Sequence, residues 1–118
     1  MNPEMLKART KRFAIESAIL CEGLPSRLSM IAYSKQLIRS SSSIGANYRA
    51  ACRAKSLSDF INKLKIVEEE TDESLYFMEL IGELNPSHKN LLVPLIKEGN
   101  ELLSIIVTSI NTAKKRRG

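Results

Sequence analysis

The sequence predicts an all-α protein that folds as an antiparallel up-and-down four-helix bundle. Apolar residues recur every three or four positions along most of the chain, which is the period of an amphipathic helix. Strand signals are nearly absent, because polar and apolar residues do not alternate and aromatic residues make up only 5% of the chain. Clear proline or glycine breaks are few, so we expect long helices joined by short connections.

The first helix is expected to begin at Asn2 and Pro3 and to stop at Gly23. Asparagine is a favourable N-cap, proline is favoured at the first helical position, and a glycine followed closely by Pro25 is typical of a helix end. The residues that mark its buried side are Leu6, Phe13 and Leu20.

The second helix is expected to run from about Ser26 to Ala54. Small residues occupy its middle, from Ser40 to Ala46, although serine and glycine each disfavour a helix interior by up to about 1 kcal/mol. Something must therefore pack closely there, either a neighbouring helix or another subunit. The expected core face comprises Met30, Tyr33, Leu37, Ser41, Ile44, Tyr48 and Ala51.

The third helix is expected to start at a capping box formed by Ser56 and Asp59 and to end near Leu84, before Asn85 and Pro86. Its expected apolar stripe comprises Phe60, Leu64, Val67, Thr71, Leu75, Met78 and Ile81.

The fourth helix is expected over about residues 87–113, with Pro94 either kinking it or marking its true first turn. Its expected stripe comprises Leu92, Ile96, Gly99, Leu103, Ile106 and Ile110. The chain therefore divides into a bundle over residues 1–113 and a basic C-terminal tail over residues 114–118.

The composition favours an intracellular protein with acidic partners. The net charge is +5 over 118 residues, which suits nucleic acid or acidic proteins but says nothing about sequence specificity. Cys21 and Cys52 lack metal-ligand or C-x-x-C spacing, so both are expected to be reduced thiols. No apolar run is long enough to span a membrane, and the N-terminus lacks the apolar region of a signal peptide. We therefore expect a cytoplasmic protein without a membrane partner.

The second helix is purely cationic, because no acidic residue occurs between Leu24 and Ser58. At 100° per residue, Lys35, Arg39, Arg49 and Arg53 share one face and could lie along a polyanion such as nucleic acid. The alternative is that the cations pair with acidic residues of the third helix. An antiparallel hairpin about Ser56 would place Arg39 near Glu73 and Ser42 near Glu70, and would leave Arg49 and Arg53 freer.

The sequence contains few residues in patterns suited to catalysis or metal binding. A di-iron bundle needs two Glu-x-x-His motifs, and His88 is the only histidine. We expect His88 to be exposed in a first helical turn. Neither a catalytic triad nor a glycine-rich phosphate loop is present, so we expect no enzyme activity, no metal and no cofactor.

One stretch of sequence resembles a known family. Arg39, Ser43, Ile44 and Asn47 form an Arg-Ser-x-x-Ser-Ile-x-x-Asn pattern, which is followed by acidic residues from Glu70 to Glu73. This pattern resembles the four-helix bundle family encoded by intervening sequences within bacterial 23S ribosomal RNA genes. That family also looks related to the accessory variability protein of diversity-generating retroelements, a pentameric bundle that binds reverse transcriptase and nucleic acid. The resemblance implies a bacterial cytoplasmic homopentamer without enzymatic activity.

The leading hypothesis is a non-enzymatic homo-oligomeric adaptor that binds RNA or DNA, or a ribonucleoprotein such as a ribosome or a reverse transcriptase complex. The alternative is a structural protein-interaction module whose cations form ion pairs within or between subunits. The residues expected to bind nucleic acid are Lys35, Arg39, Arg49, Arg53, Lys114, Lys115, Arg116 and Arg117. The expected structural signature comprises Ser43, Ile44, Asn47, Glu70 and Glu73.

Overall fold

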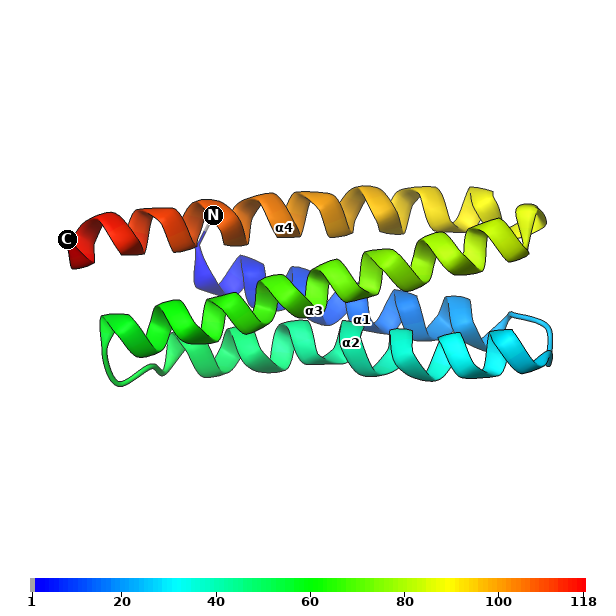
Figure 1. Cartoon of the computed structure of the whole chain (residues 1–118), viewed down its shortest axis with the longest axis horizontal. Helices are drawn as coiled ribbons and strands as arrows, with labels where there is room; N and C mark the ends of the chain where they lie inside the picture. Colours follow the sequence, from blue (N-terminus) through cyan, green and yellow to red (C-terminus); the bar gives the residue numbers. More distant parts are fainter. Residues whose placement is uncertain (1) are drawn as a thin grey trace.

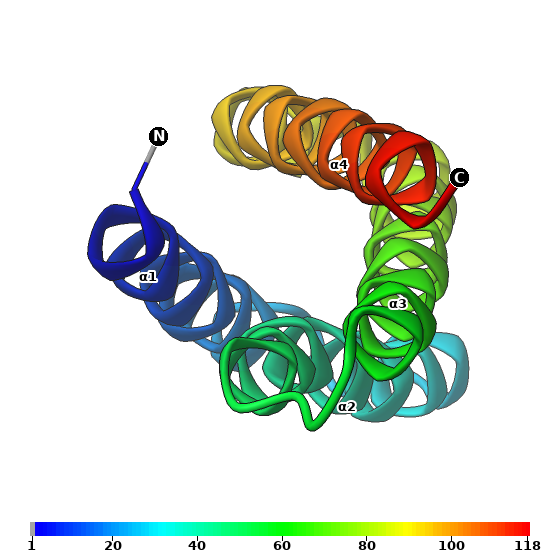
Figure 2. The ribbon, with the colours of Figure 1, turned by 90° about the vertical axis from the view of Figure 1, so that its left-hand side faces the viewer.

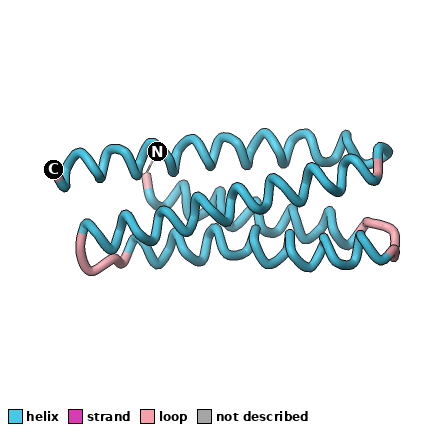
Figure 3. The backbone as a smooth tube through the Cα atoms, in the orientation of Figure 1, coloured by secondary structure: helices cyan, strands magenta, loops and turns pink. Residues whose placement is uncertain are grey.

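The computed structural model describes residues 2–118 and consists of four long helices, each antiparallel to the next (Figure 1). They are α1 (Pro3–Glu22), α2 (Leu28–Cys52), α3 (Leu57–Leu84) and α4 (Lys89–Arg117), with a 3-10 turn at Pro86–His88. The bundle measures 48 × 22 × 20 Å, and its connecting segments lie at its two ends (Figure 3). Residues 2–118 contain no strand, which confirms the predicted all-α fold.

The four helices follow one another around the bundle axis in chain order (Figure 2). The most extensive packing is between α2 and α3, while α1 packs on α2 and α4 packs on α3. The contact between α1 and α4 is smaller, and an ion pair bridges it: Arg9 Nε donates to Glu98 Oε2 at 2.9 Å. The bundle is therefore built on the central α2–α3 hairpin, with the outer helices added on either side.

Side-chain caps explain where two of the helices begin. Asn2 Oδ1 accepts the Met5 N–H at 2.8 Å, and Ser56 Oγ accepts the Asp59 N–H at 3.1 Å, as the sequence predicts. Helix α2 begins two residues later than expected and has no side-chain cap at Arg27. The reason is a tight turn after the proline, in which the Arg27 N–H donates to the Pro25 carbonyl at 2.9 Å.

Hydrogen bonds join the end of α3 to the beginning of α2. Asn85 is buried, and its backbone N–H and its Nδ2 both donate to the Ile81 carbonyl, at 2.9 and 3.0 Å, which closes the last turn of α3. The Arg27 guanidinium donates to Asn85 Oδ1 and to the Leu84 carbonyl. The register between α2 and α3 is thus fixed at this end of the bundle as well as at the connection around Ser56.

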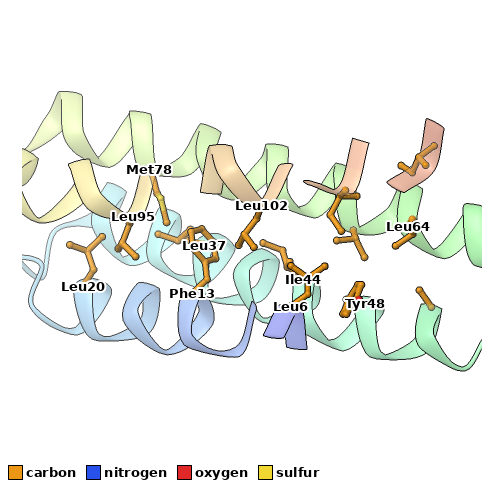
Figure 4. Close-up of a cluster of buried hydrophobic side chains, with 14 of the residues drawn as sticks. Leu6, Phe13, Leu20, Leu37, Ile44, Tyr48, Leu64, Met78, Leu95 and Leu102 are labelled. Carbon is orange, nitrogen blue, oxygen red and sulfur yellow. The ribbon is translucent and has the colours of Figure 1, made fainter. Parts of the chain in front are cut away.

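The apolar core runs along the bundle axis, as the close-up in Figure 4 shows. Five residues from the predicted stripes of α2 and α3 are buried in it: Ile44, Tyr48, Leu64, Val67 and Met78. Burying a side chain of this size contributes about 1.5–3 kcal/mol relative to exposure. The core faces predicted for these two helices are therefore confirmed at these positions.

The buried stripe of α4 differs from the predicted one at two positions. Leu95 and Leu102 are buried, whereas Ile96 and Leu103 are only half-buried. Apolar residues flank the stripe on both sides here, so periodicity alone cannot choose between neighbours, and packing against α1 and α3 decides. The helix also extends to Arg117, four residues beyond its expected end, and it contains Pro94 in its second turn.

Gly99 of α4 packs closely against side chains of α1 and α3. A Cβ atom added there would lie 2.7 Å from Leu75 Cδ2 and 3.3 Å from Phe13 Cζ. The absence of a side chain at Gly99 therefore makes room for Leu75 of α3 and Phe13 of α1 against α4.

Candidate functional site

The fold brings together two groups of predicted site residues that lie far apart in sequence. Arg49 and Arg53 are at the end of α2, and residues 114–117 form the last turn of α4. Both helices end at the same end of the bundle, beside the beginning of α1 (Figure 1). The side chains of all six residues are exposed.

Three further cations at this end were missed by the sequence reasoning. Lys7 and Lys11 lie in the first half of α1, and Lys55 lies in the connection between α2 and α3. The predicted helix order could have indicated these cations, because an up-and-down bundle places the first turns of α1 and α3 beside the last turns of α2 and α4. We call this surface the basic end; it comprises Lys7, Lys11, Arg49, Arg53, Lys55, Lys114, Lys115, Arg116 and Arg117.

The acidic residues close to the basic end already have cationic partners. Glu4 pairs with Lys7 at 3.2 Å, and Asp59 pairs with Lys63 at 2.6 Å. Asp59 Oδ2 also accepts the Lys55 N–H at 3.0 Å. The hydrogen bond from Lys63 and then the one from Lys55 hold the pKa of Asp59 below its ordinary value, so it is ionised and fully engaged.

Arg39 lies outside the basic end and joins α2 to α3. Its guanidinium bonds to Glu70 Oε2 at 3.1 Å and also to Glu73, and the bond to Glu73 raises the pKa of Arg39 above its ordinary value. The hairpin arithmetic predicts Glu73 as the neighbour of Arg39, whereas it places Glu70 near Ser42; in the structure Arg39 pairs with both carboxylates. Among the residues that the structure describes, Arg49 and Arg53 form no ion pair. The cationic face of α2 is therefore divided between Arg39, which is paired, and Arg49 and Arg53, which are not.

Lys35 is exposed but distant from the other predicted cations. It lies roughly 27 Å from Arg53 along the axis of α2 at 1.5 Å per residue. A ligand at the basic end would have to follow α2 over most of its length to reach Lys35.

The remaining signature residues of α2 lie in the core or bond to carbonyls of α2 itself. Ile44 is fully buried, Ser43 Oγ donates to the Arg39 carbonyl at 2.9 Å, and Asn47 Nδ2 donates to the Ser43 carbonyl at 2.8 Å. Together with the ion pairs of Glu70 and Glu73, these contacts give the sequence pattern a structural explanation on α2 and α3.

Small residues let α2 approach both of its neighbours. Ser74 Oγ donates to Ser40 Oγ at 2.9 Å across the buried α2–α3 seam. On the other side, a Cβ added to Gly45 would lie 3.1 Å from Thr10 Oγ1 of α1. A neighbouring helix within the chain therefore accounts for Ser40 and Gly45.

Two of the small residues, Ser42 and Ala46, remain exposed and form the floor of a groove. This groove lies between α1 and α2 and has a volume of about 390 Å³. Lys11 and Arg49 line it, and so does Ile15, which is 50% exposed. The bulk missing at Ser42 and Ala46 is not filled by this chain.

The remaining expectations concern His88, metal ions and membrane spans. His88 is half-buried rather than exposed, because it lies in the 3-10 turn before α4, where its Nδ1 is 3.3 Å from Ser87 Oγ. Within residues 2–118, acidic, histidine and cysteine side chains nowhere gather in threes that could hold a metal ion. None of the helices in this part of the chain combines the length and apolarity needed to cross a membrane.

Comparison with known proteins gives one family and one described structural neighbour. The family model for the 23S rRNA-intervening sequence protein matches residues 6–108. No curated protein matches the chain, whereas four chains of solved structures do. One of them is a protein with unknown function from the S23 ribosomal protein family of Bacteroides thetaiotaomicron, with 31% sequence identity and a TM-score of 0.81. The match covers 89% of this chain and 97% of that chain.

These matches confirm the family resemblance that the pattern in α2 and α3 indicates. Neither match names the accessory variability protein of diversity-generating retroelements, so that relation stays a prediction. Neither match names an enzymatic activity.

Replacing Arg39 by alanine is expected to lower the Tm, because the change leaves the carboxylates of Glu70 and Glu73 side by side without their shared cation. Arg49→Ala is the matched control, since it removes the same side chain from the same helix without breaking an ion pair. Thermal unfolding followed by circular dichroism compares them. The difference should shrink at high salt, which screens exposed charges; equal Tm values in dilute buffer would contradict the structural role of Arg39.

Proposed function

Because the chain belongs to the 23S rRNA-intervening sequence protein family, we propose that it is a non-enzymatic, homo-oligomeric adaptor that binds nucleic acid or a ribonucleoprotein through its basic end. The observation that carries the proposal is the convergence of unpaired cations from α2 and α4 on one end of the bundle. RNA and DNA are both candidate ligands, and a ribosome or a reverse transcriptase complex is the candidate assembly. A cytoplasmic setting is part of the proposal.

The proposed binding is electrostatic and independent of base sequence. Lysine and arginine side chains that contact phosphates release the counterions condensed on the nucleic acid, and this release drives association. Apart from the half-buried Lys7, the cations of the basic end are long and exposed, and most of them lie on helix ends or in a connection. Such an arrangement can follow a phosphate backbone, but it places no helix or strand to read base edges in a groove.

We also propose that the functional form is a ring of five chains. The number follows from the proposed relation to the accessory variability protein of diversity-generating retroelements. The groove between α1 and α2 supports self-association, because small residues leave it open and the cations Lys11 and Arg49 line it. The outer face of α3 offers a complementary surface, in which Ile66 and Tyr76 are exposed beside Glu69 and Asp72. A ring would multiply the cations and strengthen phosphate contacts by avidity.

A structural protein-interaction module is the second candidate function. The ion pairs of Arg39 with Glu70 and Glu73 favour it, because they show how a cation of α2 is used to join two helices. In that case Arg49 and Arg53 would pair with acidic groups of a neighbouring subunit, and α3 supplies such groups on its outer face. The two candidates differ in whether the assembled protein still binds a polyanion.

Wild-type protein should bind structured RNA with an affinity that falls steeply with salt and hardly depends on base sequence. The double variant Arg49→Glu and Arg53→Glu should bind more weakly to every sequence tested. For duplex ligands the slope of log K against log salt should fall in magnitude by about 2, since each phosphate contact contributes about 0.9. Fluorescence anisotropy at several salt concentrations measures both quantities.

The control for this experiment is Lys89→Glu with Lys97→Glu, which makes the same charge change on exposed residues of α4 away from the basic end. That variant should keep most of the affinity and the full salt slope. Absence of RNA and DNA binding by the wild-type protein at low ionic strength would instead favour the protein-interaction module.

The mass in solution should correspond to five chains when measured by light scattering at micromolar concentration. Ala46→Trp should shift the mass toward the monomer, because it fills the floor of the groove without touching the core. Ser104→Trp is the control, since Ser104 is exposed on α4. A wild-type monomer at this concentration would refute the ring.

A further inference from the structure

The basic end contains a pocket in addition to its exposed cations. It has a volume of about 610 Å³, and all four helices contribute to its walls. Lys7 comes from α1, Tyr48 and Cys52 come from α2, Phe60 comes from α3, and Arg116 comes from α4. A volume in this range is typical of pockets that hold small organic molecules.

The walls of the pocket combine aromatic and cationic groups. Phe60 is half-buried and packs against the core, which fixes its ring. Tyr48 is also held in the core, and burial, followed by the neighbouring Cys52 thiol, raises the pKa of its hydroxyl, which therefore stays neutral at physiological pH. Lys7 of α1 and Arg116 of α4 both line the pocket; Lys7 is half-buried and paired with Glu4 at 3.2 Å, whereas Arg116 is exposed.

The beginning of α3 also lies at the pocket, with the ionised carboxylate of Asp59 in its first turn offsetting part of the positive end of the helix dipole. Ser56 and Leu57 line the pocket, so the N-terminus of this 28-residue helix lies at its wall. Of the first amide groups of α3, Ser56 Oγ accepts a hydrogen bond from the Asp59 N–H, at 3.1 Å. Amide groups in the first turn of a helix favour a nearby anion such as phosphate.

Aromatic surface beside cations is the chemistry that recognises an unpaired nucleotide. A base can stack on an aromatic ring only when it is free of its own helix, whereas duplex nucleic acid presents chiefly its backbone. We propose that this pocket takes one unpaired nucleotide of a nucleic acid bound at the basic end, with the base against Phe60 and its phosphate beside Lys7 and Arg116. The inference rests on the proposed function and adds to it a preference for single-stranded ends or loops.

The two cysteines provide an internal probe for the test. Cys52 is exposed and lines the pocket, whereas Cys21 is buried, and burial raises the pKa of its thiol. A neutral alkylating reagent such as N-ethylmaleimide should therefore modify Cys52 of the native protein, and Cys21 reports any unfolding. Mass spectrometry follows the rate at each position.

The alkylation rate is compared with three ligands at equal occupancy: a blunt RNA duplex, the same duplex with an RNA overhang, and the same duplex with a DNA overhang. An overhang that enters the pocket should slow alkylation of Cys52 severalfold beyond the effect of the blunt duplex. Protection by the RNA overhang alone, or by both overhangs, supports binding of a nucleotide in the pocket and identifies whether the pocket accepts RNA only or also DNA. Equal rates with all three ligands would overturn it.

A variant tests the aromatic contact directly. Phe60→Leu keeps an apolar side chain in the core but removes the ring, and it should weaken binding of the overhang ligand by about fivefold or more, as loss of a stacked ring usually does. Its affinity for the blunt duplex should not change. Arg116→Gln, at an exposed position in the last turn of α4, should also reduce the protection of Cys52 by the overhang.

The outcomes separate this inference from the proposed function. Salt-dependent binding of all three ligands, with no added protection of Cys52 and no effect of Phe60→Leu, would refute the pocket and leave the electrostatic site intact. Failure to bind any of the ligands would refute both proposals.

Discussion

The structure depends on the antiparallel pairing of α2 with α3. Small residues bring these helices together, and Ser74 bonds to Ser40 in the buried seam at 2.9 Å. Arg39 then joins the edges of the pair through Glu70 and Glu73. A serine-rich segment has poor intrinsic helix propensity, so α2 exists because packing in the bundle stabilises it. The same pairing occupies Arg39 and leaves Arg49 and Arg53 unpaired within the described chain.

Bundle topology then determines where the remaining positive charge gathers. The ends of α2 and α4 and the beginnings of α1 and α3 lie at one end of the bundle, so Arg53, Arg116, Lys7 and Lys55 all lie at that end. Cations at the C-terminal ends of α2 and α4 also complement the helix dipoles, so their placement is favourable before any ligand binds. A surface that is stable without a partner and rich in exposed cations suits a reversible electrostatic contact.

Local signals in the sequence were sufficient to predict the four helices, but they did not determine every core position or the site. Asn2 and Ser56 cap their helices as predicted, because a cap depends on only a few neighbouring residues. In α4 the choice of Leu95 over Ile96 depended on contacts with other helices, which periodicity does not contain. The pairing of Arg39 followed from simple hairpin register. The pocket between Tyr48, Phe60 and Arg116 could not be foreseen, because it requires the three-dimensional placement of residues from all four helices.

The central claim is that a polyanion occupies the basic end and not the bundle as a whole. Lysine reactivity with an acylating reagent, read by mass spectrometry with and without structured RNA, tests it most directly. The account predicts that RNA protects Lys7, Lys11, Lys55, Lys114 and Lys115. It also predicts that Lys89 and Lys97, which are exposed on α4 away from the basic end, react at an unchanged rate. Equal protection of all the lysines, or protection confined to Lys89 and Lys97, would contradict the account.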